Sequence, residues 1–195
     1  MDDHETGTSD RILDAALRLM QAKGFKSVTI KDIAAASDVS EMTVFRHYKT
    51  KKGVLEAAVQ KYSYTPGLKI IVEQNVVYDL NHDLKLIAAS YLDLMEVNRG
   101  IFLIAVQERA TMPELIGLIA DNTKRLHGVL TDYFLTMQER GKMAVTDASK
   151  QAMMFLTMYY GYFSSRALWD TQFISDTQEE FIATSVSTFC EGLAT

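Results

Sequence analysis

The residues with the clearest chemical potential lie between Thr29 and Lys52, where hydroxyl, basic and imidazole side chains alternate with apolar anchors. Hydroxyls and free backbone amides at helix starts bind anions, and a lysine adds positive charge at such a terminus. Arginine and glutamate side chains can hydrogen-bond to the edges of nucleic-acid bases. This mixture predicts contacts to phosphates and bases.

Two short helices joined by a tight turn must position these side chains. Thr29 is placed to cap the first helix and Ser40 the second, and the polar stretch 37–40 forms the turn, with Val39 as its buried anchor. Spacings of three and four put the other apolar residues on the inner faces: Ile30, Ile33, Ala34, Val44 and Tyr48. Apolar anchors behind and polar groups in front suit a helix that enters a major groove, so the pattern predicts a helix-turn-helix.

The same stretch resembles the DNA-binding region of TetR-family transcriptional regulators. The distinguishing part is the aromatic-x-His-aromatic run Phe45–Tyr48 followed by Lys51, and the further matches are Thr29, Asp32-Ile33-Ala34, Val39-Ser40, Thr43-Val44 and Leu55. The motif resemblance covers about residues 9–60, whereas the remainder matches in length and all-helical pattern. It implies a repressor that binds a palindromic operator as a homodimer and is released by a small, hydrophobic effector.

The resemblance also implies which residues touch DNA. The phosphate-contacting positions are Thr29, Thr43, Phe45, His47 and Lys51, and the complete expected set adds Ser40, Glu41, Met42 and Arg46. We expect Thr43 and Lys51 to supply affinity, and Met42 and Arg46 to read bases. For the lysines at 49, 51 and 52 the alternative is a solvated helix start.

Three positions depart from the family pattern. Asp38 stands where the turn usually has glycine, but aspartate tolerates a left-handed backbone, so we expect the turn to form. Phe45 replaces the commoner tyrosine and offers packing in place of a hydroxyl. Glu41 can accept a hydrogen bond from a cytosine amino group, although it repels phosphate.

The formal net charge of −5 hides an uneven distribution. From Arg11 to Lys61 there are ten Lys and Arg against five Asp and Glu, whereas the chain from Tyr62 onward has ten basic and sixteen acidic residues. Screening limits each charge to a reach of about 8–10 Å at cellular salt, so the local balance decides phosphate binding. A basic unit on an acidic body is therefore compatible with a DNA partner.

Two prolines and ten glycines in 195 residues leave few breaks and favour helices. We expect an all-α fold of nine or ten helices: an N-terminal three-helix helix-turn-helix domain, then a helical-bundle domain for ligand binding and dimerisation. The expected division is a mobile acidic arm at 1–8, the DNA-binding domain at 9–60 and the effector domain at 61–195. Pro66-Gly67 is the candidate hinge between the last two. Ser9 or Asp10 is the expected cap of the first helix, Asn81-His82-Asp83 of a helix over about 84–97, and Asp176 of the last helix.

Composition argues for a cytoplasmic protein without cofactors. Cys190 is the sole cysteine, which excludes an intramolecular disulfide, and we interpret it as a buried apolar residue, with redox sensing as the alternative. The first ten residues do not form a signal peptide, and no apolar stretch is long enough for a membrane. Scattered histidines, and the absence of a glycine-rich phosphate loop, predict neither a metal site nor an enzyme.

Two C-terminal segments predict a homodimer. The helix Ala152–Trp169 is apolar almost all round, so it must be covered on every side, and the helix Asp176–Leu193 carries a one-sided apolar stripe. Together they predict a four-helix interface across a two-fold axis. The alternative is an interior helix of a monomeric bundle.

We expect the effector pocket to be lined mainly by methionine and aromatic residues, whose bulk and flexibility suit a hydrophobic, adaptable cavity. They are Met95, Phe102, Arg109, Tyr133, Met154, Met158, Tyr159 and Tyr162. The alternative interpretation is that the same residues belong to an ordinary hydrophobic core. For the protein as a whole, the alternative function is a helix-turn-helix module that binds another protein and has no specific DNA site.

Overall fold

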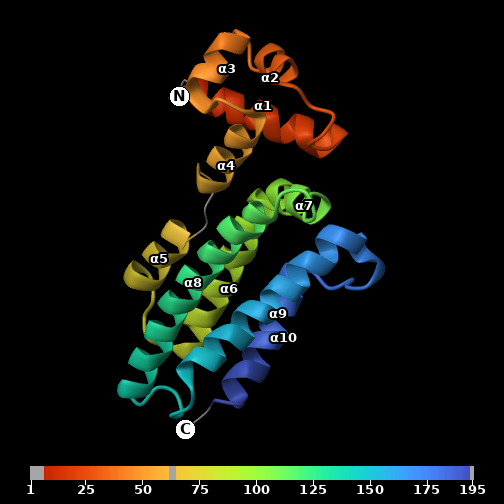
Figure 1. The fold of residues 1–195 in the computed structure, drawn as a ribbon. Coiled ribbons are helices and arrows are strands. Elements are labelled where there is room, and N and C mark those ends of the chain that lie inside the picture. The colour runs from red at the N-terminus through yellow and green to blue at the C-terminus, as the bar shows by residue number, and fades with distance from the viewer. Residues whose placement is uncertain (1–6, 62–64, 194–195) are drawn as a thin grey trace, which may run out of the picture. The chain divides into compact units, whose positions relative to one another are not determined.

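The computed structural model describes residues 7–61 and 65–193. Within these residues all regular secondary structure is helical and there is no strand, which confirms the expected fold class and the helix count (Figure 1). A short 3-10 turn at Asp170–Gln172 follows the ninth helix. The helices are α1 Thr8–Lys23, α2 Ile30–Ala36, α3 Glu41–Tyr48, α4 Lys51–Lys61, α5 Thr65–Gln74, α6 Leu80–Val97, α7 Arg99–Gln107, α8 Pro113–Glu139, α9 Ala148–Trp169 and α10 Gln178–Glu191.

The chain divides into two compact units that do not follow chain order. The first contains α1 to α4, α7 and the start of α8 as far as Ile119, and the second contains α5, α6, the rest of α8, α9 and α10. Residues 98–119 thus belong to the N-terminal unit, although they come well after it in the sequence. Residues 1–6, most of the expected acidic arm, and 62–64, beside the expected hinge, lie outside the described residues.

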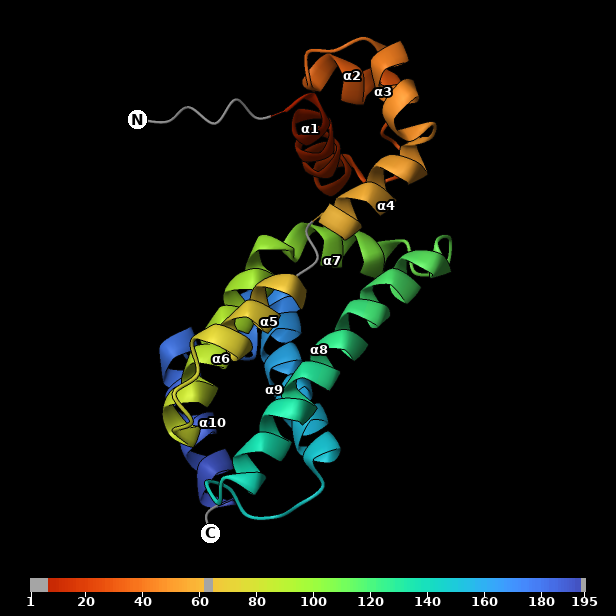
Figure 2. The same ribbon diagram turned by 90° about the vertical axis from the view of Figure 1, so that its left-hand side faces the viewer.

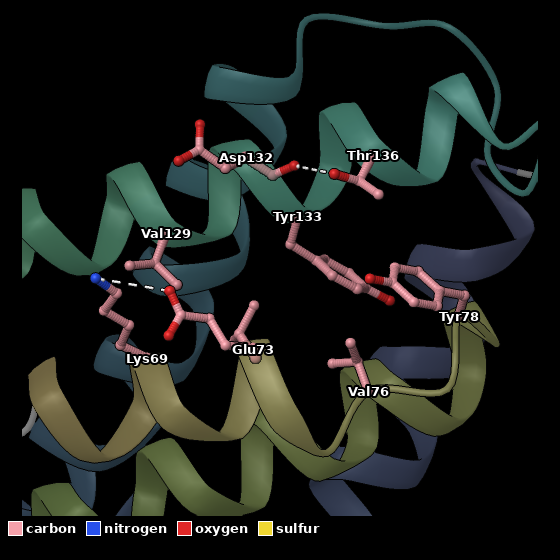
Figure 3. A pocket seen from close by; sticks show the side chains of 9 residues that line it. Lys69, Glu73, Val76, Tyr78, Val129, Asp132, Tyr133 and Thr136 are labelled. Atoms are coloured by element: carbon pink, nitrogen blue, oxygen red, sulfur yellow. Dashed lines mark hydrogen bonds and ion pairs between the residues drawn. The ribbon is translucent and has the colours of Figure 1, made fainter.

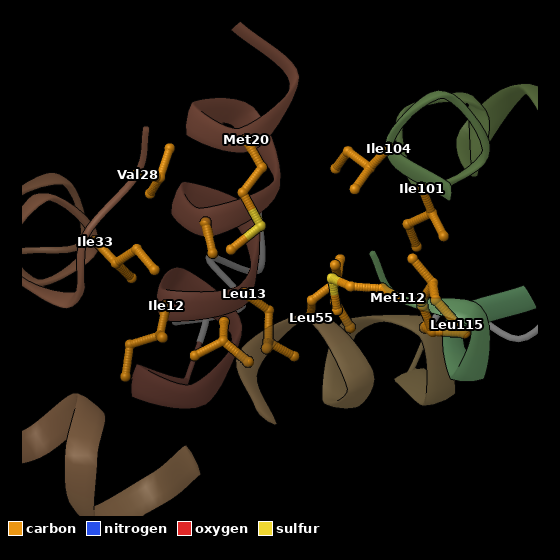
Figure 4. Close-up of a cluster of buried hydrophobic side chains, with 14 of the residues drawn as sticks. Ile12, Leu13, Met20, Val28, Ile33, Leu55, Ile101, Ile104, Met112 and Leu115 are labelled. Atoms are coloured by element: carbon orange, nitrogen blue, oxygen red, sulfur yellow. The ribbon is translucent and has the colours of Figure 1, made fainter. Parts of the chain in front are cut away.

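One apolar core holds the first unit together (Figure 4). Helix α1 contributes Ile12, Leu13 and Met20, which are almost completely buried because its apolar positions recur at helical spacing. Helix α7 and the start of α8 complete this core from a distant part of the chain, through Ile101, Ile104, Ala105, Met112 and Leu115. The three-helix core expected from sequence is therefore extended by α4, by α7 and by the chain around the start of α8.

Three helix starts differ from the sequence-based predictions. Helix α1 begins after Gly7, so Ser9 and Asp10 lie inside its first turn and neither is its cap. At α6 the side chain of Asp79 accepts the His82 N–H at 2.8 Å, so the cap lies before the predicted residues. At α10 the cap is Thr177, which forms a capping box with Glu180. At α6 and α10 a neighbouring residue offers the capping side-chain oxygen, whereas no side chain caps α1.

The second unit is built around α6, which packs against α5, α9 and α10 (Figure 2). Its core is aromatic: Phe134 of α8 lies near Phe155 of α9 and Phe189 of α10, with ring centroids 6.4 and 6.1 Å apart. These separations allow favourable edge and offset contacts. The apolar stripe of α10, including Ile182 and Val186, is used in this core.

The junction between α3 and α4 is unusually tight. Lys49 adopts a left-handed backbone (φ 63°), and Thr50 then caps α4 by accepting the Gly53 N–H at 2.9 Å. A Cβ atom at Gly53 would lie 2.3 Å from the main-chain oxygen of Tyr48, a distance that side chains do not adopt. Glycine is therefore required where the last turn of α3 meets the first turn of α4.

We predict that Gly53→Ala destabilises the protein by about 1–3 kcal/mol, because the added methyl group must displace the backbone of α3. Gly117→Ala is the matched control: it is also a helical glycine, but open space surrounds its Cβ position. This control should stabilise by about 0.5–1 kcal/mol through helix propensity. Urea unfolding measures both changes, and a Gly53→Ala protein as stable as the control would contradict the close approach.

Candidate functional site

Helices α2 and α3 and the turn between them form the frame of the candidate site. Ile33 and Val44 are fully buried and fix the two helices to the core. In the turn, Asp38 has a left-handed backbone (φ 53°), as predicted for this non-glycine residue. Ser37 is buried and donates to the Ile33 carbonyl at 2.7 Å, whereas Val39, the predicted anchor, is half-buried against the core. The local geometry is that of a helix-turn-helix.

Helix α3 has one buried and one exposed face. Val44 has no exposed surface, and the hydroxyl of Tyr48 lies 2.6 Å from that of Ser9 in α1, which ties the end of α3 to the first helix. On the opposite face, Met42 is 73% exposed and Phe45 is 53% exposed. The polar members of this face, also exposed, are Glu41, Arg46 and His47. These five residues, all in the expected DNA-binding set, form one outward surface, which we call the α3 outer face.

The hydroxyl groups of the expected set have partners within the protein. Ser40 accepts the Thr43 N–H at 3.1 Å, and the two hydroxyls are 2.9 Å apart, so Ser40 caps α3 as predicted. Both residues lie at the start of α3, where backbone amides point away from the helix. An anion at this end of the helix would meet the amides and the two hydroxyls together.

Thr29 forms a complete capping box with Asp32 at the start of α2. Its hydroxyl and its N–H both donate to Asp32 Oδ2, at 2.6 and 2.8 Å, and the hydroxyl accepts the Asp32 N–H at 3.1 Å. The hydrogen bonds from the Thr29 side chain and backbone lower the pKa of Asp32. The carboxylate therefore stays ionised at neutral pH and compensates the positive end of α2.

Lys51, expected to contact phosphate, points into the first unit. Its Nζ donates to the main-chain oxygens of Phe25 and Val28, each at 2.6 Å, and of Lys26 at 3.3 Å. Burial lowers the pKa of Lys51, and the charge of Glu108 partly opposes this shift. The neighbouring Lys49 is exposed instead, with its Nζ 5.6 Å from the centre of the Phe45 ring.

A separate cavity of about 400 Å³ lies in the second unit, between α5, the 75–79 connection and α8 (Figure 3). Its size is in the range of small-molecule sites. Apolar and charged groups share the lining, and Lys69 pairs with Glu73 at 3.6 Å near its edge. The lining residues are Lys69, Val72, Glu73, Val76, Tyr78, Val129, Asp132, Tyr133 and Thr136.

A buried carboxylate behind the cavity fixes one of its walls. Asp83 of α6 has no exposed surface; it accepts the hydroxyl of Tyr133 at 3.0 Å and the N–H of Val77 at 2.9 Å. Burial and the charge of Asp83 raise the pKa of Tyr133, so its hydroxyl remains a donor. Tyr78 adopts a left-handed backbone (φ 61°), and the Arg140 guanidinium lies 3.6 Å from its ring centre. The 75–79 connection is thus held from two sides.

Sequence reasoning missed Asp83 because it was interpreted as part of a helix cap. The signal that could have found it is its register: Asp83 lies four residues before Ile87, on the buried face of α6. Helix α5 ends at Gln74, and Val77 in the connection to α6 is exposed. The left-handed conformation of Tyr78 has no signature in the sequence.

The expected effector-binding residues are not brought together. Phe102 and Arg109 lie in the first unit, with Phe102 buried and Arg109 exposed. The others lie in the second unit: Met95, Tyr133, Tyr159 and Tyr162 are buried, Met158 is half-buried and Met154 is exposed. The hydroxyls of Tyr159 and Tyr162 are bonded to the Ser185 hydroxyl and the Asp176 carbonyl. Of this set, Tyr133 is the member that lines the described cavity.

Other chemical features of the described chain are few. No group of three His, Cys, Asp or Glu side chains among the described residues could hold a metal ion. Burial raises the pKa of Cys190, which disfavours the reactive thiolate. None of the described helices combines the length and the apolar character that crossing a membrane requires.

Comparisons with known proteins match two successive parts of the chain. A family model for bacterial regulatory proteins of the tetR family matches residues 12–58, and one for the C-terminal domain of AefR-like transcriptional repressors matches residues 82–192. The chain is 33% identical, over 187 residues, to the HTH-type transcriptional regulator YvkB of Bacillus subtilis, covering 96% of this chain and 97% of that protein.

Two further likenesses are more distant. The HTH-type negative transcriptional regulator IcaR of the Staphylococcus aureus biofilm operon icaADBC is 22% identical over 154 residues, covering 77% of this chain and 81% of that protein. The solved structure of the fatty acid degradation regulator FadR from Bacillus halodurans superposes with a TM-score of 0.74 at 15% identity. That superposition covers 96% of this chain and 97% of the other, and it shows the shared fold.

We predict that Met42→Ala changes which DNA sequences are preferred and leaves the salt dependence of binding unchanged. Met42 is the more exposed of the two large apolar residues on the α3 outer face and carries no charge, so it can contact base edges without neutralising phosphates. A single changed base pair in a specific site typically weakens the binding free energy by about 1–3 kcal/mol. The measurement is selection of bound sequences, with affinity at several salt concentrations; the control Ile70→Ala removes an exposed apolar side chain from α5 and should leave the preference unaltered.

Proposed function

Since the chain belongs to the TetR family of bacterial regulatory proteins, we propose that it binds a palindromic operator as a homodimer and represses transcription until a small molecule releases it. The named relatives are transcriptional regulators and not enzymes. Repression is favoured as the direction of control because IcaR is described as a negative regulator. A regulator of bacterial genes would work in the cytoplasm.

The observation that carries the DNA-binding proposal is the α3 outer face. Its five residues project from an eight-residue helix whose inner residues are fixed in the core, which is the arrangement needed to read base edges in a major groove. Arg46 can reach guanine or phosphate, and Glu41 can accept from cytosine. The amides at the start of α3, flanked by Ser40 and Thr43, suit a phosphate.

The homodimer proposal is supported by the two faces of α9. Phe155, Tyr159 and Phe163 are buried in the second unit, whereas the opposite face leaves large apolar side chains exposed. This exposed face, which we call the α9 outer face, carries Met153, Met154, Tyr160, Leu168 and Trp169. A row of large apolar side chains on one helix is typical of a surface that another protein chain covers. The α10 stripe is already used internally, so α10 would contribute its outward polar residues.

The effector proposal is supported by the cavity in the second unit. Valine side chains of α5, the 75–79 connection and α8 would take apolar parts of a ligand, and Lys69, Glu73 and Asp132 would orient polar ones. The proposed effector is therefore small and amphipathic, which adds a polar requirement to the hydrophobic one expected from sequence. A full swing from bound to released DNA needs a preference of about 5.5 kcal/mol for the released state.

Selection from random duplex DNA with the purified protein tests the proposal. The expected product is a palindrome whose half-site centres lie about 10 bp apart, or a multiple of that distance, because two recognition helices must enter successive grooves. If the protein retains DNA but no sequence is enriched, only non-specific DNA binding is supported. No salt-dependent retention on DNA or heparin would favour the protein-interaction module, for which the exposed Met42 and Phe45 would be the contact residues.

Light scattering at micromolar concentration tests the dimer, with an expected mass of twice 21.9 kDa. Met153→Glu together with Tyr160→Glu places two charges on the α9 outer face and should give the monomer mass, because burying unpaired charge is costly. Val145→Glu is the control, since Val145 is 86% exposed in the α8–α9 connection and should leave the dimer intact. A monomeric wild-type protein would remove the dimer from the proposal.

A further inference from the structure

The ammonium group of Lys51 occupies a site made of main-chain oxygens. The carbonyls of Phe25, Lys26 and Val28 all lie within 3.3 Å of Nζ, and the Phe25 ring centre is 4.4 Å away. An ammonium has three protons to donate, and here three acceptors are present. The aromatic ring adds a further favourable contact for the cation.

These carbonyls belong to the connection between α1 and α2, which has few other donors for them. Val28 N–H donates to the Phe25 oxygen at 3.4 Å, and this is a long turn bond. Partly buried carbonyls need donors, so Lys51 replaces the backbone pairing that a regular helix would have supplied. The connection runs directly into Thr29, the cap of α2, and Lys51 is the first residue of α4. One side chain therefore joins α4 to the start of the helix-turn-helix.

We propose that Lys51 is a positioning residue, which holds the 25–28 connection and the start of α2 against α4, and that it is not a contact to the DNA backbone. Its three donors are used inside the protein. Turning them to a phosphate would take the lysine donor from all three carbonyls and leave the Phe25 carbonyl with only its long turn bond. Phosphate charge is instead met by the exposed cations Lys49 and Arg46. The part of this inference that concerns DNA contacts rests on the proposed function. The part that concerns the stability of the protein does not depend on DNA binding.

The surroundings of Lys51 agree with an internal role. Glu108, at the end of α7 in the same unit, is 8% exposed, and its carboxylate accepts the hydroxyl of Thr111. Its negative charge favours the protonated lysine against the effect of burial. The negative charge of this buried residue therefore stabilises the ammonium at its partly buried position.

The test compares three variants by urea unfolding and by affinity for random-sequence duplex DNA at several salt concentrations. Lys51→Met removes the ammonium and keeps the aliphatic part of the side chain. It should lower the urea concentration at the unfolding midpoint by roughly 1 M. It should also weaken DNA binding, but the salt dependence of the affinity should equal that of the wild type. Lys49→Met is the matched control at an exposed lysine. It should leave the midpoint unchanged and reduce the slope by about one unit.

Lys51→Arg separates position from charge. A planar guanidinium cannot converge on the same three carbonyls, so this variant should also lower the unfolding midpoint although its charge is unchanged. A Lys51→Arg protein with wild-type stability and affinity would overturn the proposal, as would a reduced salt slope in Lys51→Met. If the wild-type protein binds no DNA, the proposed function fails, and the two unfolding midpoints alone decide the role of Lys51.

Discussion

Helices of seven and eight residues do not persist alone in water, so α2 and α3 depend on the apolar core of the first unit. Ile33 and Val44 are the points at which this dependence is concentrated, because each is fully buried and each lies on one of the two short helices. The core that receives them contains parts of α7 and α8, which come much later in the chain. The geometry of the α3 outer face is therefore a property of the whole unit.

Polar groups around this frame have two different uses. Those at helix starts and connections, such as Thr29, Ser40 and Lys51, are bonded to the protein's own backbone or carboxylates and hold the helices in place. The side chains of Arg46 and His47 face outward. This division explains how a short motif rich in polar residues can be both rigid and available to a partner, since preorganised groups lose little entropy on binding.

The second unit combines a fixed core with surfaces suited to regulation. Aromatic rings from α8, α9 and α10 fill its centre, and Asp83 holds the 75–79 connection through Tyr133 and the Val77 amide. The cavity beside this connection and the α9 outer face are left open by the same packing. In the proposed function, the cavity is the candidate effector site and the α9 outer face is the candidate surface for a partner subunit.

The sequence alone determined the all-helical class, the caps at Thr29 and Ser40 and the left-handed Asp38, because caps and turns depend on residues close in the chain. It also located the α3 outer face, through helical periodicity. Tertiary structure decided the partners of Lys51, the burial of Asp83, the cavity, and the placing of residues 98–119 with the N-terminal helices. These depend on contacts between segments 20 to 100 residues apart, which local spacing does not encode.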